Sequence, residues 1–139
     1  MFSTKDKRLF DVAKSVSYTS DYKYVQMGAV IARNRNVLSV GTNQTKTHTL
    51  QKEFNVHRKF DTVDVDHCIH AEIDAINKVR YRDLSNCSIY IYREKQEKKK
   101  TVLGMARPCA ACMEAIIRHG IKHVYYTTEN GFAYERINI

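Results

Sequence analysis

The sequence contains no tryptophan, one proline and five glycines among its 139 residues. No proline- or glycine-rich linker marks a boundary, so we expect residues 1–139 to form a single domain around one core. No apolar run approaches the length of a membrane-spanning helix, and we expect no membrane association. The N-terminal segment is charged and lacks the apolar stretch of a secretion signal, which favours a cytoplasmic protein.

Acidic residues are in deficit, because 15 Asp and Glu face 23 Lys and Arg, and the formal net charge is +8. This balance favours a polyanionic partner or a phosphorylated substrate, although an ordinary solvated surface can also be basic. The most basic stretch is Lys95–Lys100. We interpret it as a solvated loop, with a contact surface for nucleic acid as the alternative.

The sequence contains four cysteines, Cys68, Cys87, Cys109 and Cys112. In a small secreted chain, four cysteines would predict two disulfides. Because nothing in the sequence indicates secretion, metal binding or catalysis is the better interpretation.

Hydrophobic periodicity predicts an α-β-β-α-β-α-β order, with a last short strand near the C-terminus. A mixed sheet flanked by helices follows from that alternation. Residues 43–66 are expected to form a long functional loop with a helical turn near Leu50–Phe54, and residues 93–104 a basic excursion. Helices are expected at 4–18, 70–80 and 109–119, and strands at 28–32, 37–42, 87–92, 122–127 and 132–139.

Two short motifs carry the chemistry. His70-Ala-Glu72 opens one predicted helix, and Pro108-Cys109-Ala-Ala-Cys112 opens another. Either motif alone is a modest signal. Together, and in this order, they match the His-x-Glu and Pro-Cys-x-x-Cys signature of zinc-dependent nucleobase deaminases.

The spacing of these residues suits a catalytic zinc ion. Cys109 and Cys112 lie three residues apart in a first helical turn, where both sulfurs can face one ion and the helix dipole favours thiolates. With His70 as third ligand, the fourth position stays open for a water molecule. Glu72 is positioned to take a proton from that water and deliver it to the substrate.

Other interpretations of the same residues remain open. Cys68 or His67 would close a purely structural zinc site if either supplied a fourth ligand. The Cys-x-x-Cys pair would be redox-active in another context. Glu72 would then be an ordinary carboxylate at a helix start.

From about residue 5 to about residue 128, the sequence resembles the cytidine and deoxycytidylate deaminase superfamily, which includes tRNA adenosine deaminases. The resemblance rests on the two motifs and is looser elsewhere. It implies a three-layer α/β/α fold with a mixed sheet of about five strands. It also implies a homo-oligomer.

The resemblance implies further site residues. Asn43, in a Gly-x-Asn at the end of the second strand, is expected to bind the base or sugar, with a plain turn asparagine as the alternative. Ala29, in a Gly-Ala-Val strand, is expected to line the base pocket. The backbone of Ala71 is expected near the reacting amino group. Tyr126 is a candidate pocket wall or a core residue, and Arg107 a candidate phosphate ligand or a surface arginine.

Three functions compete on these grounds. The first is deamination of cytosine in a free nucleotide, most simply dCMP. The second is deamination of cytosine or adenine within single-stranded DNA or RNA, including tRNA, which the basic charge and the tyrosines favour. The third is a non-catalytic, zinc-stabilised module that binds nucleic acid.

Overall fold

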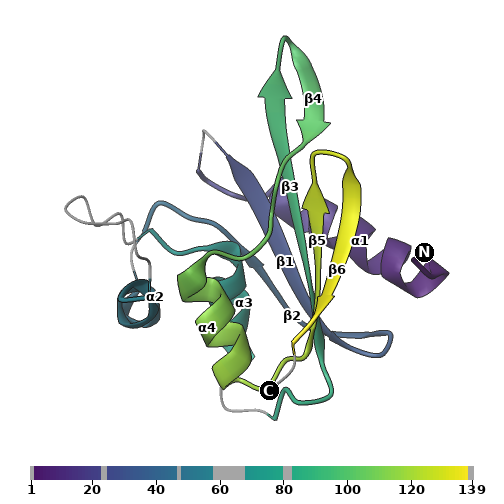
Figure 1. The fold of residues 1–139 in the computed structure, drawn as a ribbon. Coiled ribbons are helices and arrows are strands. Elements are labelled where there is room, and N and C mark those ends of the chain that lie inside the picture. Colours follow the sequence, from purple (N-terminus) through teal and green to yellow (C-terminus); the bar gives the residue numbers. More distant parts are fainter. Residues whose placement is uncertain (1, 23–24, 47, 58–67, 80–82, 138–139) are drawn as a thin grey trace.

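The computed structural model describes residues 2–22, 25–46, 48–57, 68–79 and 83–137. In these ranges a six-stranded mixed sheet has the order β2-β1-β3-β5-β6, and β4 pairs with the C-terminal part of β3 (Figure 1). The strands are β1 Gln26–Arg33, β2 Asn36–Thr42, β3 Ser88–Glu97, β4 Lys100–Leu103, β5 His123–Thr128 and β6 Gly131–Arg136. The helices are α1 Thr4–Ser17, α2 Thr49–Asn55, α3 Ala71–Val79 and α4 Ala110–Arg118.

The strand directions follow from the connections. β1 and β2 form an antiparallel hairpin, and β1 also pairs antiparallel with β3. The crossover through α4 makes β5 parallel to β3, and β6 returns antiparallel to β5. This mixed α/β architecture confirms the expected fold class. Five strands form the main order, and β4 is an addition to it.

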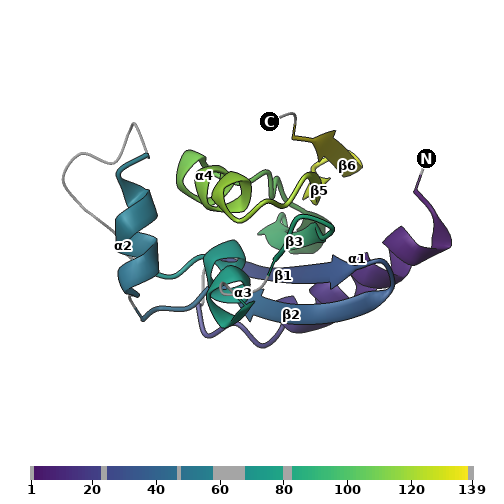
Figure 2. The same ribbon diagram turned by 90° about the horizontal axis from the view of Figure 1, so that it is seen from below.

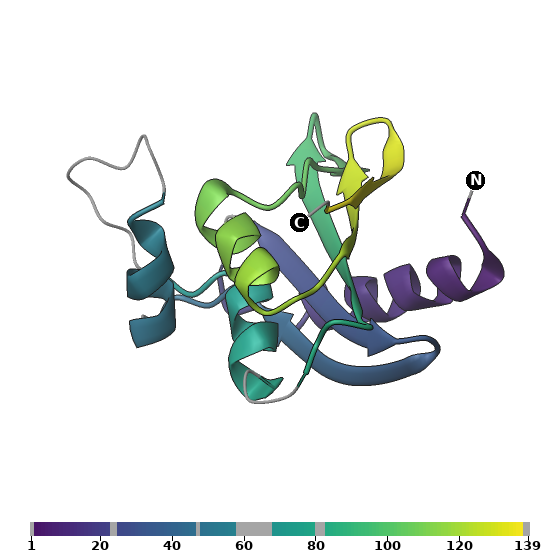
Figure 3. The same ribbon diagram turned by 60° about the horizontal axis from the view of Figure 1, so that its bottom comes forward.

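Helices cover both faces of the sheet. α1 packs on one face, against β1 and β3, while α3 packs on the other, against β1 and β2, with α4 beside it (Figures 2 and 3). Alternate side chains of a strand point to opposite faces. Val30 and Tyr90 therefore join Phe10 in the core under α1, whereas Ile31 and Ile89 join the core under α3 and α4.

Gly41 allows α3 to lie directly on β2. A Cβ atom at this position would lie 2.4 Å from the carbonyl oxygen of Ala71 and 2.4 Å from the backbone nitrogen of Ala75. No side chain fits there unless the helix moves. Because Gly41 has no side chain, the start of α3 can lie close to the sheet.

Most expected elements are confirmed within the described residues. The helical turn near Leu50–Phe54 is α2, and the helix expected at 70–80 is α3, with position 80 outside the described residues. The solvated loop expected at Lys95–Lys100 was wrong, because β3 continues to Glu97 and β4 begins at Lys100, so that the basic excursion at 93–104 is largely a hairpin. Its turn holds Lys98 and Lys99 at φ 50° and 64°, a conformation usually taken by glycine or asparagine, so the residues of the turn carry no hairpin signal.

None of the helices in the described ranges is both long enough and apolar enough to cross a membrane.

Candidate functional site

The two motifs meet where α3 and α4 begin. His70 directly precedes α3, Cys109 is the N-cap residue of α4, and Cys112 lies in the first turn of α4. His70 Nδ1 is 3.3 Å from Cys112 Sγ and 3.7 Å from Cys109 Sγ, and the three candidate ligand atoms all lie within 4.8 Å of one another. Residues far apart in the sequence thus form one group that could hold a metal ion.

The two cysteines differ in their ionisation. A hydrogen bond from Cys112, supported by one from His70, lowers the pKa of the Cys109 thiol to about 4. Complete burial raises the pKa of the Cys112 thiol. A thiolate beside a thiol and an imidazole nitrogen is a donor set that suits zinc, which displaces the remaining thiol proton when it binds.

Glu72 lies beside this group, and one of its two carboxylate oxygens is unpaired within the described part of the chain. It is the second residue of α3, its side chain is 2% exposed, and its Oε1 atom has no hydrogen-bond partner among the described residues. Burial raises its pKa to about 6, and the charge of His70 offsets only part of that effect. An unpaired buried carboxylate costs stability, so its position is explained by a ligand or metal that it would meet in the site.

Helix α2 holds the backbone of His70. The amide nitrogen of His70 donates to Gln51 Oε1 at 2.9 Å, and Gln51 Nε2 donates to Asn55 Oδ1 at 2.7 Å. Gln51 is fully buried and Asn55 is buried. Sequence reasoning missed both residues, because polar side chains in a polar segment carry no sign of burial.

A pocket of about 410 Å³ opens next to His70. This volume lies in the usual range for small-molecule sites. Asn43 lines the pocket and also shapes it, since its Oδ1 accepts hydrogen bonds from Ser20 Oγ at 2.7 Å and from the Met27 amide at 2.9 Å. Its Nδ2 donates to the Val25 carbonyl at 2.7 Å. The full lining is Tyr22, Val25, Met27, Asn43, Gln44, Cys68, Ile69, His70 and Arg93.

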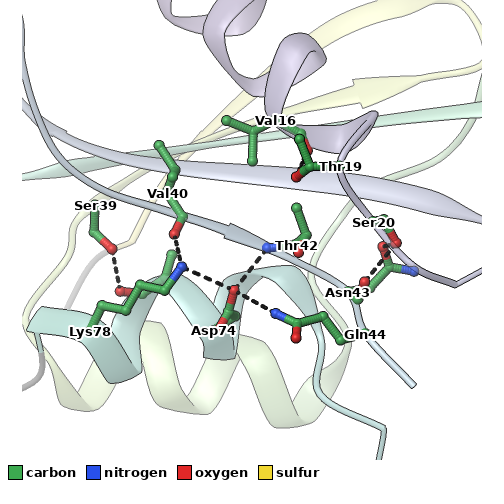
Figure 4. A network of polar contacts seen from close by, with 11 residues as sticks. Val16, Thr19, Ser20, Ser39, Val40, Thr42, Asn43, Gln44, Asp74 and Lys78 are labelled. Carbon is green, nitrogen blue, oxygen red and sulfur yellow. Dashed lines mark hydrogen bonds and ion pairs between the residues drawn. The ribbon is translucent and has the colours of Figure 1, made fainter. Parts of the chain in front are cut away.

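Asp74 ties the end of β2 to α3 (Figure 4). Its Oδ2 accepts from the Thr42 amide at 3.0 Å, from Gln44 Nε2 at 3.1 Å and from Lys78 Nζ at 3.3 Å. Asp74 is 5% exposed, so these bonds are shielded from water. The bonds hold Asn43, which follows Thr42, in a constant position relative to His70 and Glu72.

The remaining predicted site residues lie around this centre. Ala29 is buried in β1 opposite Gly41, and Ala71 is the first residue of α3. Tyr126 is 8% exposed in the core below α4, and its pKa is raised mainly by burial. Arg107 pairs with Glu135 through two hydrogen bonds, from Nε at 2.6 Å and from Nη2 at 3.1 Å.

Cys68 and His67 were the two candidates for a fourth ligand of a structural zinc site. The Cys68 thiol donates to the Thr45 carbonyl at 3.2 Å, and Cys68 is not part of the three-residue group. His67 lies outside the described residues. Sequence reasoning also missed Arg93 and Tyr22, because neither belongs to a motif.

The fold and the site define this chain as an α/β protein with a His/Cys/Cys group that could bind a metal ion where two helices begin. The family model described as the cytidine and deoxycytidylate deaminase zinc-binding region matches residues 3–128. The chain therefore belongs to the cytidine and deoxycytidylate deaminase family.

Individual relatives agree with that membership. The chain is 30% identical over 132 residues to an uncharacterized deaminase in the luxG 3′ region of Aliivibrio fischeri, covering 90% of this chain and 74% of that protein. It is 29% identical over 125 residues to a probable deoxycytidylate deaminase of Caenorhabditis elegans, covering 88% of this chain and 56% of that protein. The fold is similar to that of the dCMP deaminase of cyanophage S-TIM5, with a TM-score of 0.63, 21% identity and coverage of 92% and 86%.

Proposed function

We propose that this protein is a zinc-dependent deaminase that hydrolyses the exocyclic amino group of cytosine in a free nucleotide, with dCMP as the simplest substrate. The observation that carries the proposal is the buried Glu72 beside His70, Cys109 and Cys112, with one carboxylate oxygen unpaired among the described residues. A structural zinc site has no use for such a carboxylate. A hydrolytic site needs it as the group that moves protons.

His70, Cys109 and Cys112 would hold a zinc ion, which would supply Lewis acidity to the site. Glu72, whose pKa is raised to about 6, takes a proton from the attacking water and returns it to N3 of the ring. The oxygen of the water adds to C4 of the ring. The bond between C4 and the exocyclic amino nitrogen then breaks. Glu72 transfers the second proton of the water to the leaving amine, so cytosine and water give uracil and ammonia.

The pocket contributes orientation. Asn43 lines the wall beside His70, and one hydrogen of its Nδ2 is not used by the Val25 carbonyl. We assign that hydrogen to the base or the sugar. The choice of a free nucleotide is supported by the size of the pocket and by the relatives, which include a probable deoxycytidylate deaminase and a dCMP deaminase.

A second candidate is deamination within single-stranded DNA or RNA. The observation that favours it is the β3–β4 hairpin, which carries Lys95 and Lys98–Lys100 and extends beyond the neighbouring strands (Figure 1). Such a basic projection suits the backbone of a polynucleotide. A non-catalytic zinc module is the third candidate, and nothing besides the net charge supports it.

The test is a mass-spectrometric deamination assay on zinc-loaded protein with dCMP, deoxycytidine, adenosine nucleotides, single-stranded DNA and tRNA. We expect conversion of dCMP by the wild type. Glu72→Ala and Glu72→Gln should keep their zinc and lose turnover by a factor of roughly 10² to 10⁴, since that is the usual contribution of a general acid–base group.

The matched control is Glu53→Gln, which neutralises an exposed carboxylate on α2 and should leave turnover unchanged. Full activity in Glu72→Gln would remove Glu72 from the reaction. Conversion of the polymer alone would select the second candidate. A wild type that holds zinc but converts nothing would reject the deaminase assignment for these substrates.

A further inference from the structure

The guanidinium of Arg93 lies at the pocket with few partners. Arg93 follows the buried part of β3 and lines the same pocket as Asn43 and His70. Among the described residues, the Met105 carbonyl is its one side-chain acceptor, bonded to Nη1 at 3.0 Å, while Nε is buried and has no partner. No carboxylate of the described chain lies within ion-pair distance of it. A fixed arginine with unused donors at a pocket wall is the group that recognises a phosphate.

Arg107 offers much less to an anion. Its Nε and Nη2 are already bonded to both oxygens of Glu135, which neutralises its charge in a bidentate pair. Arg107 is also absent from the lining of the pocket. A phosphate that approached Arg107 would have to displace a carboxylate, whereas Arg93 bonds the Met105 carbonyl and pairs with no carboxylate of the described residues.

The β3–β4 hairpin holds Arg93 in position. The hairpin returns the chain so that the Gly104 amide donates to the Arg93 carbonyl at 2.9 Å, and Thr127 Oγ1 accepts from the Arg93 amide at 3.1 Å. The side chain of Arg93 then packs on Gly104, where a Cβ atom would lie 3.0 Å from its Cδ and 3.1 Å from its Nε. The absence of a side chain at position 104 therefore leaves room for this orientation of the guanidinium.

We infer that Arg93, and not Arg107, binds the phosphate of the nucleotide substrate and so sets the preference for a nucleotide over a nucleoside. The inference rests on the proposed function, because it assumes that a nucleotide occupies this pocket. It assigns Arg93 a binding role and leaves the proton transfers to Glu72.

The experiment measures binding and turnover separately in zinc-loaded full-length protein. Calorimetry compares dUMP with deoxyuridine, and kinetics compare kcat/KM for dCMP with that for deoxycytidine. We expect Arg93→Gln to reduce the preference for dUMP over deoxyuridine, and for dCMP over deoxycytidine, roughly 10- to 100-fold. Arg93→Lys should restore part of it, since lysine keeps the charge and loses the planar fork. Gly104→Ala should also weaken the preference, because it displaces the guanidinium without removing its charge.

The matched control is Arg35→Gln, which removes one positive charge from the β1–β2 turn, at the far end of the hairpin from the pocket. It should keep the wild-type preference. Preference retained by Arg93→Gln, or lost in Arg107→Gln instead, would overturn the inference. Equal binding of dUMP and deoxyuridine by the wild type would overturn it as well. Because binding is measured without turnover, a wild type that binds dUMP through Arg93 but converts no dCMP would support the inference and reject the proposed reaction.

Discussion

At the scale of single residues, the site consists of side chains that are expensive to bury. Glu72 is a carboxylate inside the protein, Cys112 is a buried thiol that must lose its proton to bind a metal, and Gln51 is a buried amide that holds the backbone of His70. Gln51 and Cys112 both contact His70, whereas Oε1 of Glu72 has no hydrogen-bond partner among the described residues. Burial of polar and ionisable groups around His70 is therefore the physical signature of this site.

The stability of the metal-free protein should depend on Glu72 in a defined pH window. The pKa of Glu72 is raised from 4.5 to about 6 by burial, so between these values the folded state binds more protons than the unfolded state. Stability contributed by this group is consequently lost as pH rises from about 4.5 to about 6. The loss above that window amounts to about 2 kcal/mol, at roughly 1.4 kcal/mol per pKa unit.

Glu72→Gln removes the charge and nearly keeps the shape. We expect metal-free Glu72→Gln to be more stable than the metal-free wild type at pH 7.5, by about 2 kcal/mol, and equal to it near pH 4. Urea unfolding at the two pH values measures the difference. Glu53→Gln should show no such pH dependence. Equal stabilities of wild type and Glu72→Gln at pH 7.5 would contradict a buried Glu72 carboxylate with a raised pKa.

At the scale of elements, the site depends on how closely α3 approaches β2. Gly41 leaves room for the helix, and Asp74 accepts hydrogen bonds from the Thr42 amide and from Gln44 Nε2 between the two elements. Glu72 belongs to α3, His70 directly precedes it, and Asn43 follows β2. The distance between the reacting centre and the pocket wall is therefore set by one helix–strand contact.

Gly41→Ala should disturb both stability and the site. Its new methyl group would lie 2.4 Å from two backbone atoms of α3, and neither can move without the whole helix. We expect a loss of about 1–3 kcal/mol of stability or more, together with weaker zinc binding. Thermal unfolding and metal titration check these effects.

The control for Gly41→Ala is Val37→Ala on the same strand, where the side chain is 40% exposed and the cost should be small. A Gly41→Ala protein with wild-type stability and zinc affinity would show that α3 tolerates a shift, and that the close contact does not set the geometry of the site.

At the scale of the whole molecule, the chemistry gathers at one end of the sheet. The starts of α3 and α4, the end of β2 and the outer part of β3 all contribute to it, as is usual for α/β folds. The face under α1 holds an aromatic core with Phe10 and Tyr90, and it contributes no residue to the pocket. The β3–β4 hairpin extends beyond the neighbouring strands (Figure 1). Its lysines and the net charge of +8 are the basis for the second candidate function, deamination within a polynucleotide.

The turn of that hairpin offers a clean test of the polynucleotide function. Lys98→Asn with Lys99→Gly puts the favoured Asn-Gly pair at the two positive-φ positions and removes two charges. We expect a hairpin at least as stable as before, unchanged turnover of dCMP, and weaker binding of a single-stranded oligonucleotide. The slope of log affinity against log salt should fall by up to about 2.

Fluorescence anisotropy over a salt series measures that slope. Lys122→Asn is a matched control, because it removes an exposed charge outside the hairpin. Oligonucleotide affinity unaffected by the double substitution would mean that the hairpin is not a contact surface for nucleic acid.

The sequence alone predicted the residues of the candidate site and most of the elements. The His-x-Glu and Pro-Cys-x-x-Cys motifs, each at a helix start, predicted the group that could hold a metal ion and the role proposed for Glu72, and hydrophobic periodicity predicted the mixed α/β fold. Local patterns suffice for this, because helical periodicity and ligand spacing are properties of neighbouring residues. Asn43 was also placed at the pocket from a short motif.

Only the tertiary structure decided which charges are free and which polar residues are buried. Arg107 and Arg93 look alike in the sequence, yet one is neutralised by Glu135 and the other keeps an unpaired donor at the pocket. Gln51 reads as part of a polar loop and lies fully buried against His70. The reason is physical: a local pattern specifies which groups can pair, but pairing and burial depend on partners that folding brings from distant parts of the chain.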